Sequence, residues 1–251
     1  MNERVWEVFF EIHEGLRRQG PGSDRSTLEA LGKVAGLPGS PRILDLGCGP
    51  GAQAVLLATQ TGGHVTAVDN HRPFLETVAR RAVDHGVGEL VQPLCADMRR
   101  PGLSPGSFDL IWSEGALYQM GFGSALEACR ELLVPGGHLA ASEAAWLRPD
   151  PPPECVRCWE SEYPAITDEA GNRAIIEGAG FEIVHSFVLP KSDWWDEYYT
   201  PLDERWPRFA EKYAGDADAM VAVDWTREEI DVYRRFGDYY GYVFFVMRGP
   251  L

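Results

Sequence analysis

The chain has 251 residues, of which 45% are hydrophobic, so it can bury one full α/β core and is short for two independent domains. Its formal net charge of −15 at pH 7 would repel a bare nucleic acid duplex and an anionic membrane at long range. These numbers predict a single domain whose partner is a small molecule, with no nucleic acid and no membrane. They do not indicate an oligomeric state.

The first residues and the cysteines indicate a reducing compartment. Residues 1–10 lack the basic segment and cleavage site of a signal peptide, and no apolar run is long enough to cross a bilayer. The five cysteines are odd in number and mostly scattered through predicted core elements, as expected for reduced thiols. We therefore expect a cytoplasmic protein.

Cys155 and Cys158 form a C-x-x-C pair, which can be redox-active or half of a zinc site. No second pair exists, and the proline-rich run before it lacks the strand-to-helix context of a redox motif. The six histidines show no H-x-x-x-H spacing. We expect two cysteines on one face of a short helix, and no metal.

The predicted elements begin with two helices. One apolar stripe predicts an amphipathic helix over Glu3–Arg18, Gly20–Ser23 interrupts it, and a second helix follows near Thr27–Val34. Apolar segments then alternate with helical ones, and strands are predicted near residues 42–46, 64–68, 90–94, 108–112 and 138–142. Pro73 and Ser124 mark the starts of two helices between these strands. Such alternation predicts a doubly wound, mostly parallel sheet.

The last third of the chain departs from this alternation. Phe181–Leu189 is predicted as the sixth strand and Tyr242–Met247 as the seventh. Between them lies an insertion of residues 190–238 that is rich in aromatic and acidic residues. It is too long for a hairpin loop, and Asp224–Phe236 has helical spacing. We predict that the insertion is a substrate cap that works with the N-terminal helix.

Residues 43–51 carry the most specific motif, in which an apolar strand meets Asp45 and three closely spaced glycines. Glycine lets the backbone turn sharply and approach a ligand, and the next helix presents unpaired N–H groups. Gly47, Gly49 and Ala52 also satisfy the G-x-G-x-x-G/A fingerprint of dinucleotide sites. However, the Asp45 carboxylate would repel a pyrophosphate and could attract an ammonium group. The motif therefore favours a nucleoside with polar appendages over NAD.

At this motif the chain resembles the class I S-adenosylmethionine (SAM) dependent methyltransferases, whose first motif is acid-x-Gly-x-Gly-x-Gly. Asp45, Gly47, Gly49 and Gly51 occupy those positions. Four later segments resemble the family's in the same order: Val65–Asp69, Leu94–Met98, Ser107–Glu114 and Leu132–Leu139.

The resemblance implies roles for the residues that follow the second and third strands. Asp69 would accept hydrogen bonds from both ribose hydroxyls, since a carboxylate suits a diol. The Asp97 side chain would accept from the adenine amine, and the Met98 N–H would meet the ring. Asn70 and Ser113 are also predicted to contact the cofactor.

Two segments are candidates for the methionine end of SAM. Gln53 lies in the first turn of the helix after the glycines, where it can reach the carboxylate, and the alternative is an exposed helix residue. Gly20–Ser23 can fold over the same end or form a plain turn between helices. Outside residues 40–145 the chain is similar to bacterial methyltransferase-like proteins whose substrate is not established, so the resemblance implies a reaction and no acceptor.

The fold implied is α/β, with a Rossmann-like, doubly wound, seven-stranded sheet that is mostly parallel and has an antiparallel last strand beside the sixth. We predict one methyltransferase domain over residues 1–251. It would comprise an N-terminal helical lid (1–39), a SAM-binding core (40–189 and 239–251) and the substrate cap (190–238).

Three polar side chains follow carboxyl ends of predicted parallel strands, where open α/β sheets bind ligands. Glu114 is the predicted catalytic residue, because a carboxylate near the methyl group can take a proton from an amine acceptor. The alternative is that Glu114 caps a turn or binds a backbone amide beneath the cofactor. Tyr118 and Glu143 are predicted to contact the substrate.

Trp194 and Trp195 are also predicted to contact the substrate, because adjacent tryptophans cannot easily share one buried face. Aromatic faces beside carboxylates suit an amine or a quaternary cation. Ordinary packing in the core is the alternative.

Together these features predict a methyltransferase that uses SAM as co-substrate, releases S-adenosylhomocysteine (SAH) and acts on a small molecule. SAM carries an activated methyl group, so the protein mainly aligns the acceptor and excludes water. The acidic, aromatic insertion slightly favours nitrogen over oxygen or carbon as the acceptor atom. The alternatives are a SAM- or SAH-binding protein without transferase activity and, through Ala52, an NAD-dependent oxidoreductase.

Overall fold

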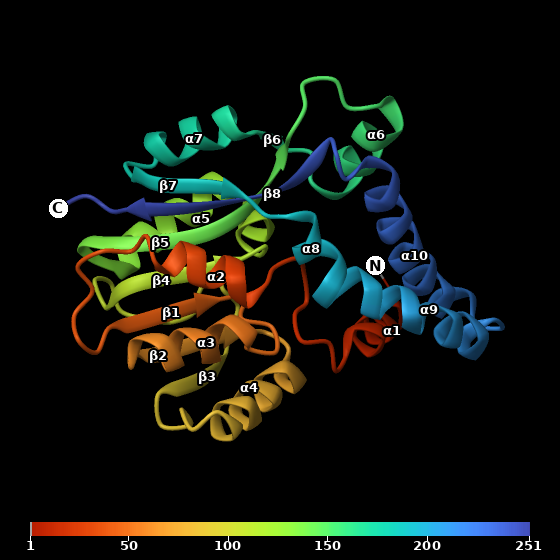
Figure 1. The fold of residues 1–251 in the computed structure, drawn as a ribbon. Helices are drawn as coiled ribbons and strands as arrows, with labels where there is room; N and C mark the ends of the chain where they lie inside the picture. The colour runs from red at the N-terminus through yellow and green to blue at the C-terminus, as the bar shows by residue number, and fades with distance from the viewer. Residues whose placement is uncertain (1) are drawn as a thin grey trace.

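One mixed sheet runs through the centre of residues 2–251, the part of the chain that the computed structural model describes (Figure 1). Its strand order is β3-β2-β1-β4-β5-β8-β7, and β6 pairs with the end of β5. The strands are β1 (Arg42–Leu46), β2 (His64–Asp69), β3 (Val91–Cys95), β4 (Phe108–Glu114), β5 (Leu133–Trp146), β6 (Thr167–Asp168), β7 (Glu182–Val188) and β8 (Tyr240–Arg248).

The topology confirms the predicted doubly wound, mostly parallel sheet. Strands β1 to β5 run parallel, and β8 runs antiparallel between β5 and β7. The two late strands predicted from the sequence are β7 and β8. The short β6 was not predicted, and it makes the sheet eight-stranded.

Helices cover both faces of the sheet (Figure 1). One face carries α2 (Asp24–Leu31), α3 (Ala52–Thr61) and α4 (Arg72–Asp84), and the other carries α5 (Phe122–Leu132) and α7 (Glu169–Gly178). Successive strand residues point to opposite faces, so one strand serves both cores. In β4, Leu110 and Trp112 pack in the core beneath α2, α3 and α4, whereas Ile111 packs in the core beneath α5 and α7.

A third apolar cluster forms a helical cap beyond the carboxyl ends of the parallel strands (Figure 1). The cap contains α1 (Glu3–His13), α6 (Pro153–Glu162), α8 (Lys191–Trp194), a π-helical turn (Trp195–Tyr199), α9 (Thr200–Tyr213) and α10 (Ala217–Phe236). Val5, Val8 and Ile12 of α1 are buried in the same cluster as Ile230 of α10. The N-terminal helix and the late insertion therefore pack together in one layer.

Three predicted helix starts or ends were wrong by about one turn. The first helix ends at His13 because Gly15 turns the chain at a φ of 77°, a left-handed conformation that favours glycine. The second begins before Thr27, because the Ser23 hydroxyl caps it by accepting the Ser26 N–H at 3.2 Å. Ser124 does not cap α5, which begins at Phe122 after a positive-φ glycine.

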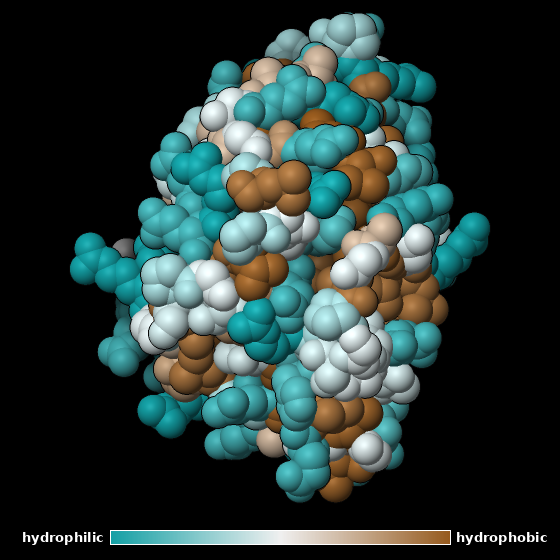
Figure 2. All heavy atoms as spheres, turned by 90° about the vertical axis from the view of Figure 1, so that its left-hand side faces the viewer, coloured by the Kyte–Doolittle hydropathy of each residue, from teal (hydrophilic) through white to brown (hydrophobic). Residues whose placement is uncertain are grey.

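One face of the molecule is mostly hydrophilic. Figure 2 shows the face at the amino ends of the parallel strands, where hydrophilic residues predominate and hydrophobic ones form separate small groups. Within residues 2–251, no helix has both the length and the apolar character needed to cross a membrane.

Candidate active site

A cavity of about 1100 Å³ lies between the carboxyl ends of the parallel strands and the cap. Its cofactor half borders the segments that follow β1, β2 and β3. We call the other half the inner chamber, and it is bordered by Tyr118, Trp159, Tyr163, Trp194, Tyr198, Tyr199, Glu229, Tyr240 and Tyr242. The position follows the rule that open α/β sheets bind ligands outside the carboxyl ends of their strands.

The glycine motif forms the first wall of the cofactor half. Gly47 and Gly49 border the cavity and have φ values of 70° and 51°, where a residue with a side chain is strained. A Cβ at Gly47 would lie 2.5 Å from Ala116 Cβ, so the turn has no room for alanine. The Gly47 N–H donates to the Val68 carbonyl at 2.9 Å, which fixes the loop against β2.

Asp69 ends β2 and borders the cavity beside Asn70. Its Oδ2 accepts the Gly49 N–H at 2.9 Å, and its Oδ1 accepts the His71 N–H at 2.8 Å. These bonds hold the carboxylate in place, and each oxygen keeps capacity for another donor. The geometry fits an acceptor for a diol.

Asp97 and Met98 border the same half of the cavity, after β3. Asp97 Oδ1 accepts the Arg99 N–H at 2.9 Å, and the Arg99 guanidinium donates to the Gln119 carbonyl at 2.6 Å. The segment is thereby tied to the 3-10 turn η1 (Leu117–Met120). An acceptor side chain is therefore present where the resemblance implied an adenine contact.

Asp45 lies fully buried beneath the glycine loop and does not itself border the cavity. The Gln53 amide donates to its Oδ1 at 3.4 Å, whereas Oδ2 has no hydrogen-bond partner within residues 2–251. Burial, reinforced by the charge of Glu114, raises the pKa of Asp45 well above its usual range. An unpaired buried acceptor behind Gln53, which does border the cavity, fits the ammonium end of SAM through a bridging water.

Besides Asp45, two predicted cofactor residues lie outside the cavity. Ser113 is fully buried, and its hydroxyl donates to the Leu46 carbonyl at 2.8 Å, joining β4 to β1. A cofactor contact from Ser113 is therefore not supported. Gly51 begins α3 from a φ of 83°, and a Cβ there would lie 2.7 Å from Val78. Its role is to shape the turn.

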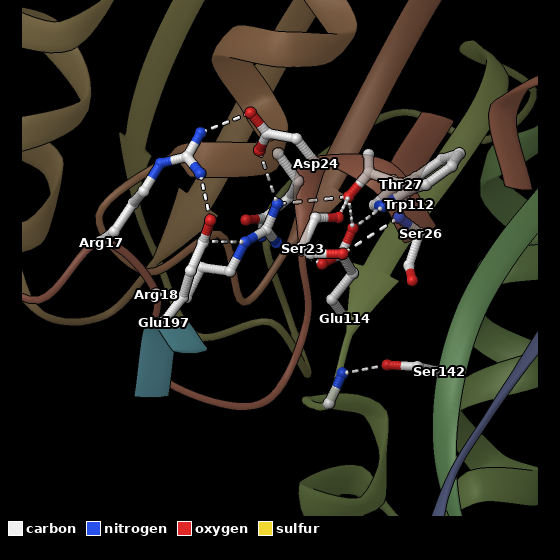
Figure 3. Close-up of polar contacts among 12 residues, drawn as sticks. Arg17, Arg18, Ser23, Asp24, Ser26, Thr27, Trp112, Glu114, Ser142 and Glu197 are labelled. Carbon is white, nitrogen blue, oxygen red and sulfur yellow. Dashed lines mark hydrogen bonds and ion pairs between the residues drawn. The ribbon is translucent and has the colours of Figure 1, made fainter. Parts of the chain in front are cut away.

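Glu114 ends β4 at the edge of the cavity, but its carboxylate already has three donors (Figure 3). Oε2 accepts from Arg18 at 2.5 Å, and Oε1 accepts from the Thr27 hydroxyl at 2.7 Å and the Trp112 indole at 2.8 Å. Both oxygens are thus occupied by donors from the protein, which leaves little room for a substrate proton. The geometry therefore argues against Glu114 as the catalytic base and favours a structural role.

Arg18 was not identified from the sequence, although it connects three parts of the molecule (Figure 3). Its side chain is 4% exposed and also pairs with Asp24 at 3.1 Å and Glu197 at 3.2 Å. The N-terminal segment is thus joined to β4, to α2 and to the π-helical turn. No local motif marks a residue whose partners are this distant along the chain.

The two tryptophans predicted to contact the substrate have different surroundings. Trp194 borders the inner chamber and stacks on Tyr233, with ring centroids 4.3 Å apart. Trp195 does not border the cavity, and the Arg234 guanidinium lies over its ring at 5.4 Å. The substrate contact predicted for Trp195 is not supported, because the side chain turns away from the cavity.

Glu143 lies behind the inner chamber, and Tyr118 borders that chamber. Glu143 is 1% exposed, and neither carboxylate oxygen has a hydrogen-bond partner in the described residues. Burial raises its pKa to about 8, although the nearby Tyr163 hydroxyl opposes part of the rise. Glu143 does not border the cavity, so the substrate contact predicted for it is not supported.

Glu229 of α10 is the second residue that sequence reasoning missed. It borders the inner chamber, and its Oε1 accepts from the Tyr199 hydroxyl at 3.0 Å and the Tyr198 hydroxyl at 3.3 Å. Glu229 is exposed along this cavity, and the partial loss of hydration there raises its pKa to about 7. The apolar periodicity of α10 did not indicate a site residue here, because two adjacent glutamates are typical of a solvent-exposed helix face.

The C-x-x-C pair lies on the short helix α6, as expected from the sequence. Cys155 is buried, and burial raises the pKa of its thiol to about 11, which disfavours the reactive thiolate. In residues 2–251, no group of three or more histidine, cysteine or acidic side chains is arranged to hold a metal ion.

Comparison with known proteins identifies the cofactor half. Residues 43–137 match a family model described as a methyltransferase domain. The uncharacterized methyltransferase YodH of Bacillus subtilis is 28% identical over 194 residues, which cover 75% of this chain and 80% of the relative.

Two further relatives are named for different acceptors. A trans-aconitate 2-methyltransferase of Paracidovorax citrulli is 28% identical over 210 residues, covering 80% of this chain and 72% of the relative. A ribosomal RNA small subunit methyltransferase C of Chromohalobacter salexigens is 32% identical over 182 residues, covering 66% of this chain and 52% of the relative.

The whole fold also has solved counterparts. A SAM-dependent methyltransferase from Geobacter sulfurreducens, solved with SAH, superposes with a TM-score of 0.82 at 21% identity, covering 98% of both chains. The family match falls on the glycine motif, Asp69 and Asp97, the residues whose geometry fits SAM. Residues 43–137 therefore form a class I SAM-dependent methyltransferase domain, and SAM is the co-substrate.

Proposed function

We propose that the protein transfers the methyl group of SAM to a small molecule, with nitrogen slightly favoured over oxygen or carbon as the accepting atom. The observation that carries the proposal is the continuity of the cavity, which runs from the glycine motif into an inner chamber covered by the cap. The walls of this chamber are largely aromatic. They include Trp159, Tyr163, Trp194, Tyr198 and Tyr242.

The charged residues around the cavity favour an amine over an anion. The acidic residues that border it are Asp69, Asp97, Glu114, Glu162, Glu228 and Glu229, whereas the basic ones are Arg18 and Arg99. Both arginines have partners of their own, and Arg99 lies at the adenine end. An amine would meet carboxylates and the faces of aromatic rings, which attract cations.

Some residues of the chain would bind SAM, and others would exclude water from the reaction. SAM, when bound, supplies a methyl group already activated on its sulfonium sulfur. Asp69 would hold the ribose hydroxyls, Asp97 the adenine, and Gln53 with Asp45 the methionine end. The cap would keep water from the inner chamber and the aromatic walls would orient the acceptor.

A small acceptor suits the site better than a nucleic acid. The inner chamber lies beneath the cap, and the chain carries a net charge of −15, which would repel a phosphate backbone. The ribosomal RNA methyltransferase similar to this chain has a further half of its length outside the match. We therefore propose that neither nucleic acid nor membrane is the partner.

The first test is calorimetric titration of SAH, SAM and NAD into the wild type, Asp69→Asn and Asp69→Ala. Losing a charged acceptor for a diol should weaken SAH binding by about 1.5–3 kcal/mol, roughly tenfold or more. Asp84→Ala, an exposed acid on α4, is the matched control and should bind SAH like the wild type. The proposal would be refuted if SAH bound neither the wild type nor the Asp69 variants, or if NAD bound in place of SAH.

Methyl transfer is then tested by acceptor-dependent release of SAH from SAM across a panel of amines, phenols, carboxylates and carbon acids. Turnover with amines supports the nitrogen preference, and turnover with only phenols or carbon acids overturns it. Tight SAM binding without transfer to any metabolite of a cell extract would instead favour a protein that binds SAM or SAH without catalysis.

A further inference from the structure

The inner chamber holds an unusual arrangement of two adjacent tyrosines on one carboxylate. Tyr198 and Tyr199 both donate to Oε1 of Glu229, and their side chains are 5% and 1% exposed. In an α-helix of 3.6 residues per turn, adjacent side chains diverge by about 100°, so they do not reach the same atom. The π-helical turn at Trp195–Tyr199 changes that spacing, and such turns are frequent at functional sites.

The same arrangement leaves half of the carboxylate free. Both tyrosines bind Oε1, and no donor within residues 2–251 binds Oε2. Glu229 borders the open volume of the cavity, so a partner for Oε2 can come from a molecule in the inner chamber. Glu229 is exposed along this volume, so Oε2 is accessible to a bound cation, which the aromatic walls would also attract.

The neighbours of Glu229 are also consistent with a cation. Tyr118, Tyr240 and Tyr242 border the same chamber, and the charge of Glu229 contributes, after burial, to raising the pKa of each phenol. Neither Arg18 nor Arg99, the basic residues that border the cavity, contacts Glu229. The carboxylate is thus surrounded by neutral aromatic rings, which can contact an ammonium group through their faces.

We propose that Glu229 is the anchor of the acceptor site and binds an ammonium group of the substrate through Oε2, with Tyr198 and Tyr199 fixing the carboxylate. The substrate class is then a small aliphatic amine. This inference rests on the proposed function, since it concerns the acceptor half of the same cavity. It assigns specificity to a residue more than a hundred positions beyond the glycine motif.

The test uses simple probes on the full-length protein saturated with SAH. n-Butylammonium and tetramethylammonium are titrated against the fluorescence of the cavity tryptophans, with n-butanol as the neutral match. We expect both cations to bind the wild type and to bind Glu229→Gln at least tenfold more weakly. n-Butanol should bind the two proteins alike.

Three variants separate a binding role from a structural one. Glu229→Gln keeps an oxygen for the tyrosine hydroxyls, so SAH affinity should not change. Glu229→Asp restores the charge and should recover part of the cation affinity. Glu228→Gln removes an equal charge from the adjacent position, which also borders the cavity, and should change cation binding less than threefold.

The outcomes distinguish this inference from the function on which it rests. Equal cation binding by the wild type and Glu229→Gln, or an equal loss in Glu228→Gln, overturns the role of Glu229, and so does a failure of cations to bind wild type that binds SAH. Methyl transfer would still stand if acceptor-dependent SAH release were found. A wild type that does not bind SAH would remove both proposals.

Discussion

Three carboxylates near the cavity have different partners, and these partners separate their roles. Glu114 has Arg18 and two neutral donors, Glu229 has two tyrosines on one oxygen, and Glu143 has no hydrogen-bond partner in the described residues. Removing water from a carboxylate penalises its charged form unless donors replace the water. Glu114 is therefore tied into an ion pair, whereas the loss of hydration raises the pKa of Glu143 to about 8 and that of Glu229 to about 7.

Glu143→Gln should make the protein less sensitive to alkaline pH. The pKa of Glu143 is raised from 4.5 to about 8, so the wild type loses stability from this group as pH rises between those values. The isosteric amide has no such titration, and by pH 9 the variant should gain up to about 4 kcal/mol relative to the wild type. Urea unfolding at pH 5 and pH 9 measures the difference, and Glu182→Gln, an exposed residue of β7, is the control. A difference that does not change with pH would contradict the assignment.

Glu114→Gln should lower the free energy of unfolding by about 3 kcal/mol, because it leaves buried Arg18 without one of its counter-ions. The two side chains are 4% and 6% exposed. The pair Lys191–Asp238 is the control, since its side chains are 60% and 58% exposed. Asp238→Asn should therefore cost less than about 1 kcal/mol. Urea unfolding measures both variants. Equal losses in their free energy of unfolding would show that burial does not strengthen the Arg18–Glu114 pair.

At the scale of single elements, the strands were easier to predict than the helix ends. The strand starting at Arg42 was predicted residue for residue because an apolar run meets the glycine motif there. Helix ends depended on capping side chains, and Ser124 resembled a cap although Gly121 turns the chain before it. Nothing in the sequence indicated the π-helical turn. One additional residue in a helix shifts the apolar pattern only slightly, and side-chain packing can accommodate that shift.

Gly47→Ala tests the strain in the glycine loop against a matched glycine. Gly47 and Gly86 have φ values of 70° and 71°, but a Cβ would meet Ala116 at 2.5 Å in the first case and open space in the second. Both substitutions cost about 1 kcal/mol for the backbone conformation. Gly47→Ala should lose at least about 1–3 kcal/mol more, from overpacking, and should also weaken SAH binding. Thermal unfolding and SAH titration of the two variants provide the comparison, and equal behaviour would mean that the loop can relax.

Deleting Asp196, an exposed residue of the π-helical turn, should restore ordinary helical spacing and separate Tyr198 from Tyr199. We expect the deletion to weaken n-butylammonium binding at least fivefold while SAH affinity is kept. Asp196→Ala leaves the turn in place and should behave like the wild type in the same titrations. Unchanged amine binding after the deletion would show that the turn does not organise the site.

At the scale of the whole molecule, the two halves of the cavity were predictable to different degrees. The cofactor half is formed by short segments that each follow a strand, so Asp69 and Asp97 could be located from local sequence. The inner chamber combines η1, α6, the π-helical turn, α10 and β8, which are far apart along the chain. Glu229 and Arg18 gain their significance only from this assembly, and local patterns contain no information about it.

Binding of SAH should stabilise the whole domain, because its contacts span several strands of one sheet. At a concentration of 100 times Kd, linkage adds about 2.7 kcal/mol to the free energy of unfolding. For a chain of this size that corresponds to a rise in Tm of roughly 5–10 °C. Scanning fluorimetry with SAH, and with NAD as the negative control, measures it. An equal rise with NAD would contradict the specificity assigned to the glycine motif.

The place of β8 has a consequence for how the chain is completed during synthesis. This strand is synthesised after the other strands of the sheet, yet it lies between β5 and β7, and β7 pairs with no other strand of the described chain. Until residues 240–248 emerge, two strand edges stay open to other chains. The same residues bring Tyr240 and Tyr242 to the inner chamber. A nascent chain can thus form its nucleotide pocket while the acceptor chamber still lacks a wall, and ribosome-bound intermediates should bind SAH before they bind an amine.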